Sequence, residues 1–288
     1  MAVKRLIVCA DDFGLDIAVN EAVEAAHRHG ILSSTSLMVA GPAAADAVAR
    51  AKRLPALRVG LHLVVVDGRP VLPRSEIPRL IHSDGEFDRN MARAGVRFFF
   101  LPGVRRQLAM EIQAQFEAFR ATGLRLDHVN AHKHMHVHPT VAQLVVGIGR
   151  DYGMKAVRVP FEPTGALRAA FPEDHYRTPL YRPWIGVLRR RLRHAGLFVN
   201  DQLFGLAWSG AMVEERLLRL IPQLPHGVSE IYLHPATEHT PALAAAMRGY
   251  CHRQELAALV SPALRALIAE LDIRLVSYSD LAPVSAKT

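Results

Sequence analysis

The chain has 288 residues, of which 50% are hydrophobic and 22% are charged. This balance is typical of a globular protein and excludes disordered and collagen-like chains. Lys and Arg number 35 against 27 Asp and Glu, so the formal net charge is +8, which favours anionic partners. The two cysteines, Cys9 and Cys251, lie far apart and support neither a disulfide framework nor a zinc ribbon.

The chain contains no apolar run of about 18 residues, the length of a membrane span. Its first apolar stretch, Leu6–Ala10, is too short for a signal peptide. We therefore expect a cytoplasmic protein.

Short β-rich segments alternate with helical patterns. Arg5–Ala10 predicts a strand, and Asp16–His29 predicts an amphipathic helix that ends at Gly30. Further strands are expected at Ser34–Val39, Arg58–Leu63, Arg125–Asn130, Ala156–Val159, Ser229–Leu233 and Ile273–Ser277. This alternation predicts an α/β fold, an irregular (β/α) barrel of about seven parallel strands. We prefer a barrel to an open sheet because no G-x-G-x-x-G follows the first strand, and chemically interesting residues end several strands.

Two segments interrupt the alternation, at about 64–106 and 161–210. The first is rich in proline, and the second mixes aromatic residues with the basic run Arg189–Arg193. Both predict insertions over the carboxyl face of the barrel. No linker divides the chain, so we expect a single catalytic domain over residues 1–288.

Adjacent carboxylates, Asp11 and Asp12, follow the first strand. The sequence places them on a strand-to-helix turn in which Gly14 allows a sharp bend. One carboxylate could bind a ligand while the other takes part in catalysis. The alternative is an Asp that caps the following helix.

Histidines end three other predicted strands. His62 lies in an apolar strand and taken alone predicts a core histidine. If the fourth strand stays extended, its period of two places His132, His134, His136 and His138 on one face, which favours a metal site over a solvated surface. His234 ends the sixth strand just before Pro235. Together with Asp11 and Asp12, these histidines form the set expected of a mononuclear metal hydrolase.

With these motifs the chain resembles the YdjC family of metal-dependent carbohydrate deacetylases over most of its length. The resemblance is carried by the segments Ala10–Gly14, Gly30–Ser36, Gly60–Leu63, His132–Pro139 and Leu233–Pro235. The sequence from Asn130 to His136 is most similar to that of the branch associated with hopanoid biosynthesis.

The resemblance implies Asp12, His62 and His132 as metal ligands, Asp11 as the catalytic base and His234 as the acid. His134 and His136 are implied either as residues that support the metal ligands or as substrate contacts, and Arg158 as a substrate contact for a sugar hydroxyl or a carboxylate. Many relatives have an Asp where this chain has Asn130, and an amide can orient His132 without adding negative charge. For Arg158, the alternative is an exposed side chain with a snorkelling stem.

The expected reaction is removal of an N-acetyl group from an acetylated amino sugar by metal-activated water. Two nitrogens and one oxygen favour a single zinc ion, with magnesium, manganese, cobalt or nickel as alternatives. The same ligands could activate water for another amide or a phosphoester.

The 161–210 segment suggests a lipid-bearing substrate such as a glycosylated hopanoid, and peripheral association with the inner face of the membrane. Its alternatives are a lid on the barrel or a subunit interface in a homodimer. The positive charge is also compatible with a non-enzymatic protein that binds nucleic acid. However, the basic residues are scattered along the chain, apart from the run Arg189–Arg193. We therefore expect no nucleic-acid partner.

Overall fold

The structure is a computed structural model that describes residues 3–176 and 182–282. Within these residues the strands are β1 (Lys4–Phe13), β2 (Ser34–Leu37), β3 (Arg58–Leu63), β4 (Leu126–Ala131), β5 (Gln202–Phe204), β6 (Gly227–Leu233) and β7 (Arg274–Leu275). The α-helices are α1 (Ile17–His29), α2 (Ala44–Lys52), α3 (Met91–Phe100), α4 (Pro102–Ala121), α5 (Pro139–Gly149), α6 (Thr164–Ala170), α7 (Arg182–His194), α8 (Glu214–Leu220), α9 (Pro241–Ala246), α10 (His252–Leu259) and α11 (Pro262–Glu270). Short 3₁₀ turns are η1 (His132–Val137), η2 (Arg150–Tyr152) and η3 (Ile221–Gln223).

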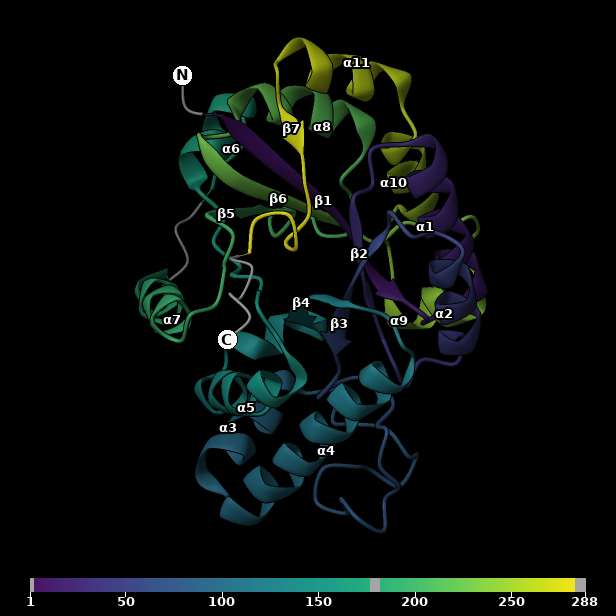
Figure 1. Ribbon diagram of the computed structural model, residues 1–288, viewed down its shortest axis with the longest axis vertical. Coiled ribbons are helices and arrows are strands. Elements are labelled where there is room, and N and C mark those ends of the chain that lie inside the picture. Colours follow the sequence, from purple (N-terminus) through teal and green to yellow (C-terminus); the bar gives the residue numbers. More distant parts are fainter. Residues whose placement is uncertain (1–2, 177–181, 283–288) are drawn as a thin grey trace, which may run out of the picture.

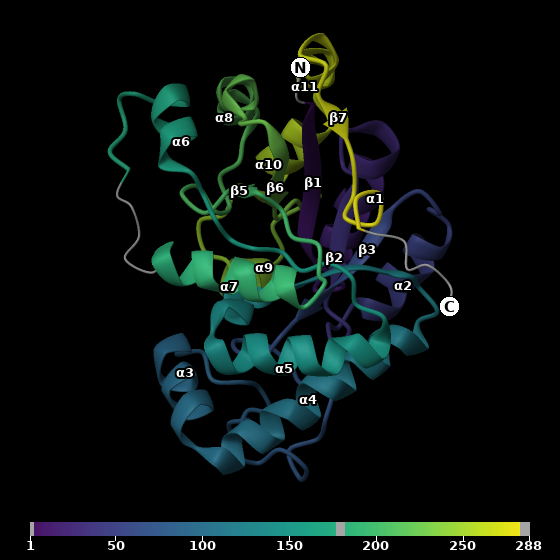
Figure 2. The same ribbon diagram turned by 60° about the vertical axis from the view of Figure 1, so that its left-hand side comes forward.

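The strands form one parallel sheet with helices around it (Figures 1 and 2). The strand order is β4-β3-β2-β1-β6-β5, and β7 pairs with the start of β1. Beyond β4 the sheet continues through single bridges that join Val129 to Val157 and Ala156 to Phe198, toward β5. The sheet therefore curls into an irregular parallel barrel, which confirms the predicted fold class.

Local patterns predicted several elements closely. Arg58–Leu63 is a strand with the expected bounds, and Asp16 caps α1 by accepting a hydrogen bond from Ala18 N at 2.9 Å. Two predictions were wrong. The segment Ala156–Val159 forms isolated bridges and not a regular strand, and Gln202–Phe204, placed inside the second insertion, pairs with β6 as β5.

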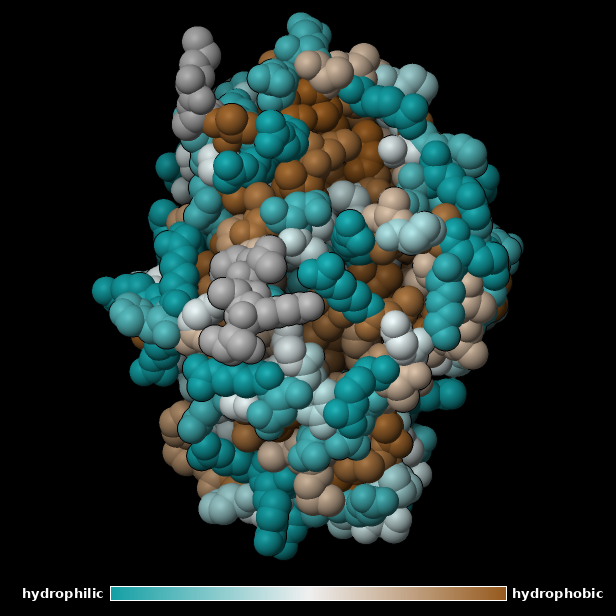
Figure 3. Space-filling model, in the orientation of Figure 1, coloured by the Kyte–Doolittle hydropathy of each residue, from teal (hydrophilic) through white to brown (hydrophobic). Residues whose placement is uncertain are grey.

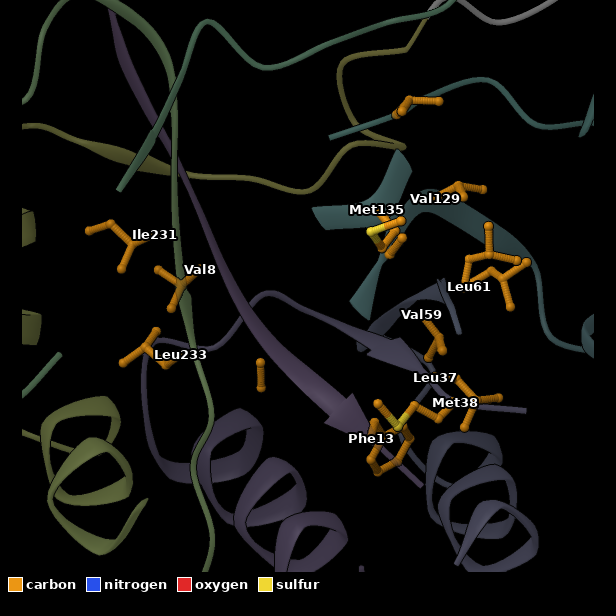
Figure 4. Packing of buried hydrophobic residues seen from close by; sticks show 14 of the residues in the cluster. Val8, Phe13, Leu37, Met38, Val59, Leu61, Val129, Met135, Ile231 and Leu233 are labelled. Carbon is orange, nitrogen blue, oxygen red and sulfur yellow. The ribbon is translucent and has the colours of Figure 1, made fainter. Parts of the chain in front are cut away.

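Side chains alternate between two environments along the central strands. Val8 of β1 and Ile231 and Leu233 of β6 face the helices and join the main apolar core, which Figure 4 shows between sheet and helices. Ile7 and Cys9 face the opposite way, into the barrel. This period of two places the polar residues of the strands in the barrel interior.

The interior is narrow at β3. A Cβ atom on Gly60 would lie 2.6 Å from Cε1 of the buried His128 ring and 2.7 Å from the His128 carbonyl oxygen. Glycine is therefore required at this position of the strand.

The second predicted insertion is in part a packed cover. Ile185, Leu188 and Leu192 of α7 are buried, and Trp184 Nε1 donates to the Val137 carbonyl at 2.7 Å. The apolar side of α7 thus faces the protein and not a bilayer, which favours the lid alternative for this segment. Residues 177–181 of this insertion lie outside the described residues. Among the helices of the described ranges, none combines the length and the hydropathy needed to cross a membrane.

Candidate metal centre and active site

The two adjacent aspartates lie on a bulge at the end of β1. The strand continues to Phe13, beyond the predicted turn, and its register with β2 shifts between Ala10 and Phe13. Asp12 adopts a left-handed backbone conformation with φ 65°. Neighbouring residues of a regular strand point to opposite faces, so this bulge allows Asp12 to meet a histidine directly while Asp11 lies against two side chains that contact the same histidine.

That histidine is His62, at the carboxyl end of β3. Its Nε2 lies 3.1 Å from Asp12 Oδ1, and Nδ1 of His132 lies 3.4 Å from the same oxygen. Donor atoms of all three residues lie within 4.8 Å of one another. The structure thus brings together the three residues expected to bind a metal.

The protonation pattern suits a cation. His62 Nδ1 lies 2.8 Å from Asn130 Oδ1, which can only accept, so Nδ1 carries a hydrogen and Nε2 is the nitrogen that a metal ion would bind. Both Asp12 carboxylate oxygens and His62 Nε2 are buried without a hydrogen-bond partner among the described residues. Buried polar atoms without partners are costly, and a divalent cation would satisfy all of them. The donor set therefore fits a metal ion.

The charge of Asp12 also favours a bound cation. Burial opposes ionisation of Asp12, but the nearby His132 and His62 imidazoles hold the pKa of its carboxyl well below the usual range. Asp12 is therefore an anionic donor at neutral pH.

The histidine run does not form the predicted single face. After His132 the chain turns through η1, with Lys133 and His134 in left-handed conformations at φ 52° and 54°. The imidazoles therefore point to different surroundings. His134 Nε2 lies 3.3 Å from the Tyr232 hydroxyl, His136 Nε2 donates to the Arg158 carbonyl at 2.9 Å, and His138 packs edge-on against Phe98.

His136 is thus held by the backbone, and not placed for substrate contact as expected. Burial and the charge of Arg158 lower its pKa to about 3, so the ring is neutral. Burial and Arg158 also hold the pKa of His134 well below its usual value.

Asn130 contacts a different candidate ligand from the one expected. Its Oδ1 accepts from His62 and not from His132, while its Nδ2 donates to Asp11 Oδ1 and to Ser36 Oγ, each at 3.1 Å. Ser36 in turn donates to Asp11 Oδ1 at 3.0 Å. The amide therefore connects a metal-ligand candidate to the candidate base, and a carboxylate here would lie against Asp11. Sequence reasoning assigned no role to Ser36, although it ends one of the quoted motifs.

Arg158 is neither exposed nor free to meet a sugar. Its side chain is fully buried, with Nη1 donating to Asp11 Oδ2 at 2.5 Å and Nη2 to Asp11 Oδ1 at 2.9 Å. Nε and Nη2 also donate to Glu230 Oε1, at 3.0 and 2.7 Å. The guanidinium therefore holds Asp11 and Glu230 and is not placed for the expected substrate contact. Burial opposes ionisation of Asp11, yet Arg158 holds the pKa of this carboxyl far below its usual value.

With this geometry in view, the chain can be compared with known proteins. A model of the YdjC-like protein family matches residues 5–270. The chain belongs to the YdjC-like family.

Curated relatives of this YdjC-like protein are similar along nearly their whole length. A carbohydrate deacetylase of Geobacillus stearothermophilus is 32% identical over 281 residues, covering 96% of this chain and 98% of the relative. A chitooligosaccharide deacetylase of Serratia marcescens is 30% identical over 286 residues, covering 96% and 99%. Among solved structures, a proposed cellobiose-phosphate cleavage protein of Enterococcus faecalis superposes with a TM-score of 0.76 at 25% identity, covering 98% of this chain and all of that one.

In this YdjC-like protein, His234 follows β6 at the level of the two aspartates, because Ala10 pairs with Leu233. Burial lowers the pKa of His234, and the charges of Asp12 and Asp11 oppose that shift. Its ring lies edge-on to Tyr232 and Tyr250, with centroids 5.5 and 5.1 Å away.

Two side chains of α10 hold the backbone of His234. Its N–H donates to Glu255 Oε2 at 2.6 Å, and its carbonyl accepts from His252 Nδ1 at 2.6 Å. Glu255 also accepts from Met212 N at 2.8 Å, and burial raises its pKa to about 7. Sequence reasoning missed Glu255 and His252, because no local pattern links α10 to β6.

A pocket of about 470 Å³ opens over His132 in the YdjC-like protein. Its lining includes Asp67, Arg69 and Arg89 from the first insertion, and Lys133 beside His132. His132 is the most exposed of the three metal-ligand candidates, at 15% for its side chain against 2% for each of the others. A substrate in this pocket would therefore meet the candidate metal site from the His132 side.

Proposed function

We propose that this protein is a metal-dependent deacetylase that removes the N-acetyl group from an acetylated amino sugar. The observation that carries the proposal is the cluster of Asp12, His62 and His132 beside a pocket: their donor atoms converge, and those of Asp12 and His62 are buried without hydrogen-bond partners among the described residues. The names of the curated relatives support a sugar substrate.

The ligands of the cation would be Asp12, His62 and His132. Two imidazole nitrogens and one carboxylate oxygen favour zinc, and manganese, cobalt, nickel or magnesium are alternatives set by availability. When bound, a divalent cation supplies Lewis-acid activation of water and of the acyl oxygen.

Asp11 is the proposed base. Its carboxylate is kept ionised by Arg158 and oriented by Asn130 and Ser36. The water oxygen attacks the acetyl carbon while a water proton passes to Asp11. A low pKa makes Asp11 a modest base, but it also makes the acquired proton easy to release.

His234 is the proposed acid. As the carbon–nitrogen bond breaks, its ring donates a proton to the departing amine nitrogen, so acetate and a free amino sugar result. The hold of Glu255 and His252 on its backbone keeps this ring in place during the transfer.

We further propose that the sugar belongs to a glycolipid, such as a glycosylated hopanoid, and that the enzyme works at the inner face of the membrane. The similarity of the sequence from Asn130 to His136 to the hopanoid-associated branch supports this substrate class, and the formal net charge of +8 favours an anionic lipid surface.

The test is an acetate-release screen over acetylated amino sugars and their lipid-linked forms, with and without chelator. We expect release that chelator abolishes and zinc restores. Asp11→Asn should retain zinc binding by calorimetry and lose turnover by about 10²- to 10⁴-fold. His132→Ala should lose both, while His138→Gln, in the same run but packed on Phe98, serves as the matched control. Phosphate release from phosphoesters in place of acetate, or chelator-insensitive turnover, would contradict the proposal.

A further inference from the structure

Helix α3 carries apolar residues on two sides. Ala94, Gly95 and Phe98 are buried against the rest of the protein. Val96, Phe99 and Phe100 follow the spacing of one helical face and are 58%, 56% and 67% exposed. Leu101, directly after the helix, is 44% exposed. We call Val96, Phe99, Phe100 and Leu101 the α3 patch.

Isolated exposed apolar residues are ordinary, but a contiguous group that includes two phenylalanines is not. Phe99 and Phe100 also contact each other, with ring centroids 4.9 Å apart. Burial of these side chains against a partner would therefore release a large apolar area from water.

The surroundings of the α3 patch are basic. Residues 90–110 contain Arg93, Arg97, Arg105 and Arg106 and no Asp or Glu. Arg93 is paired with Asp88, at 2.6 Å. Among the described residues, Arg105 and Arg106 have no carboxylate within ion-pair distance, so their charges are available to an anionic partner.

A groove continues from the patch between α3, α5 and α7. It has a volume of about 710 Å³, and its lining includes Phe99, Trp184, Leu188 and Leu192 together with Arg105 and Arg191. An apolar groove with arginines beside it matches an acyl chain that bears an anionic headgroup.

The position of α3 suits contact with a flat surface. α3 and α4 form one end of the molecule, opposite α11, in both ribbon views (Figures 1 and 2). At that end, the face drawn in Figure 3 carries hydrophobic side chains among hydrophilic ones.

We propose that the α3 patch binds the surface of an anionic lipid bilayer, with its aromatic side chains at the level of the headgroups and Arg105 and Arg106 on lipid phosphates. A helix with arginines beside exposed Phe and Leu is the pattern of interfacial membrane binding. A second copy of this chain fits less well, because a symmetric interface places the same patch against itself and brings its arginines together without acidic residues. The α3 patch lies outside the candidate metal site, so the proposed membrane binding can be tested independently of the proposed deacetylation.

The experiment is co-sedimentation of the full chain with phosphatidylcholine vesicles, with and without phosphatidylglycerol, at low and high salt. We expect binding to the anionic vesicles that high salt weakens. Arg105→Gln/Arg106→Gln should reduce partitioning about 30-fold, since each cationic side chain near such a surface contributes about a fivefold factor. Phe99→Ser/Phe100→Ser should reduce it by about tenfold or more.

Matched controls remove the same charge or apolar character elsewhere. Arg125→Gln/Arg274→Gln changes two exposed arginines, and Val3→Ser/Leu275→Ser changes two exposed apolar residues, all outside α3. These variants should bind as the parent does, and thermal unfolding checks that every variant is folded. Absence of binding to anionic vesicles, or equal losses in the controls, would overturn the proposal. So would a dimer in light scattering that the Phe99→Ser/Phe100→Ser change dissociates.

Discussion

Asp11 and Arg158 form a two-pronged ion pair inside the barrel, with Nη1 2.5 Å from Oδ2 and Nη2 2.9 Å from Oδ1. The same guanidinium is bonded to Glu230, so one buried cation holds two buried carboxylates from neighbouring strands. Each carboxylate compensates part of the cost of burying the arginine.

Arg158→Met should destabilise the fold strongly, because it leaves Asp11 and Glu230 buried without their cation. The expected loss in unfolding free energy is about 3–5 kcal/mol, measured by urea denaturation. Arg158→Lys should recover part of the stability but not the activity, because one ammonium cannot reproduce the fork to both carboxylates. Arg190→Met, on the exposed side of α7, is the control. A near-parental unfolding free energy for Arg158→Met would show that the pair is not a main support of the barrel.

Asn130→Ala should weaken metal binding without removing a ligand. The amide fixes the His62 ring through Nδ1, and loss of such a partner lowers metal affinity roughly 10- to 100-fold. Calorimetric zinc titration measures the change, with the exposed Gln113→Ala as control. Because Ser36 Oγ also lies 3.0 Å from His62 Nδ1, Asn130→Ala/Ser36→Ala should lose more affinity than either single change. Unaltered zinc affinity in the double variant would argue against His62 as a ligand.

His136→Gln should flatten the acid limb of the stability profile. His136 has a pKa of about 3 in the folded protein against an ordinary value of 6.5, so between these values the unfolded chain binds a proton that the folded chain does not. Unfolding free energy therefore falls as the pH drops through this window, by about 3 kcal/mol near pH 4 on account of this residue. A glutamine can still donate to the Arg158 carbonyl but does not titrate. Denaturant unfolding of both proteins across this range measures the difference, and parallel profiles would contradict the assignment.

Glu255→Gln should impair turnover, although Glu255 lies 21 residues after His234 in the sequence. Both carboxylate oxygens accept backbone N–H groups, from Met212 and His234, and an amide can accept at one of them only. The remaining N–H loses its buried partner, at a cost of about 1–3 kcal/mol in unfolding free energy. Acetate release should fall because His234 is held less firmly, while zinc affinity stays unchanged. A fall in zinc affinity instead would place Glu255 in the support of the metal ligands.

Much of the architecture follows from local pattern. The apolar run Arg58–Leu63 and the capped helix after Asp16 could be recognised because strand and helix periods are properties of consecutive residues. The parallel order of the strands then accounts for the meeting of Asp12, His62 and His132, since the carboxyl ends of such strands face one side of the sheet.

The directions of the side chains and their hydrogen-bond partners could not be predicted from local sequence patterns. Asp12 reaches His62 through a left-handed bulge, and the extended run expected after His132 is broken by a turn at Lys133. Both depend on backbone angles that neighbouring strands and loops impose.

By itself, the sequence determined the alternation of strands and helices and the donor residues at the strand ends, because these depend on residue type and short-range spacing. Only the tertiary structure decided that Arg158 is buried on Asp11, that Asn130 is bonded to His62, and that α3 and not α7 exposes a group of large apolar side chains. Burial depends on which distant segment covers a side chain, and that information is absent from any local stretch of sequence.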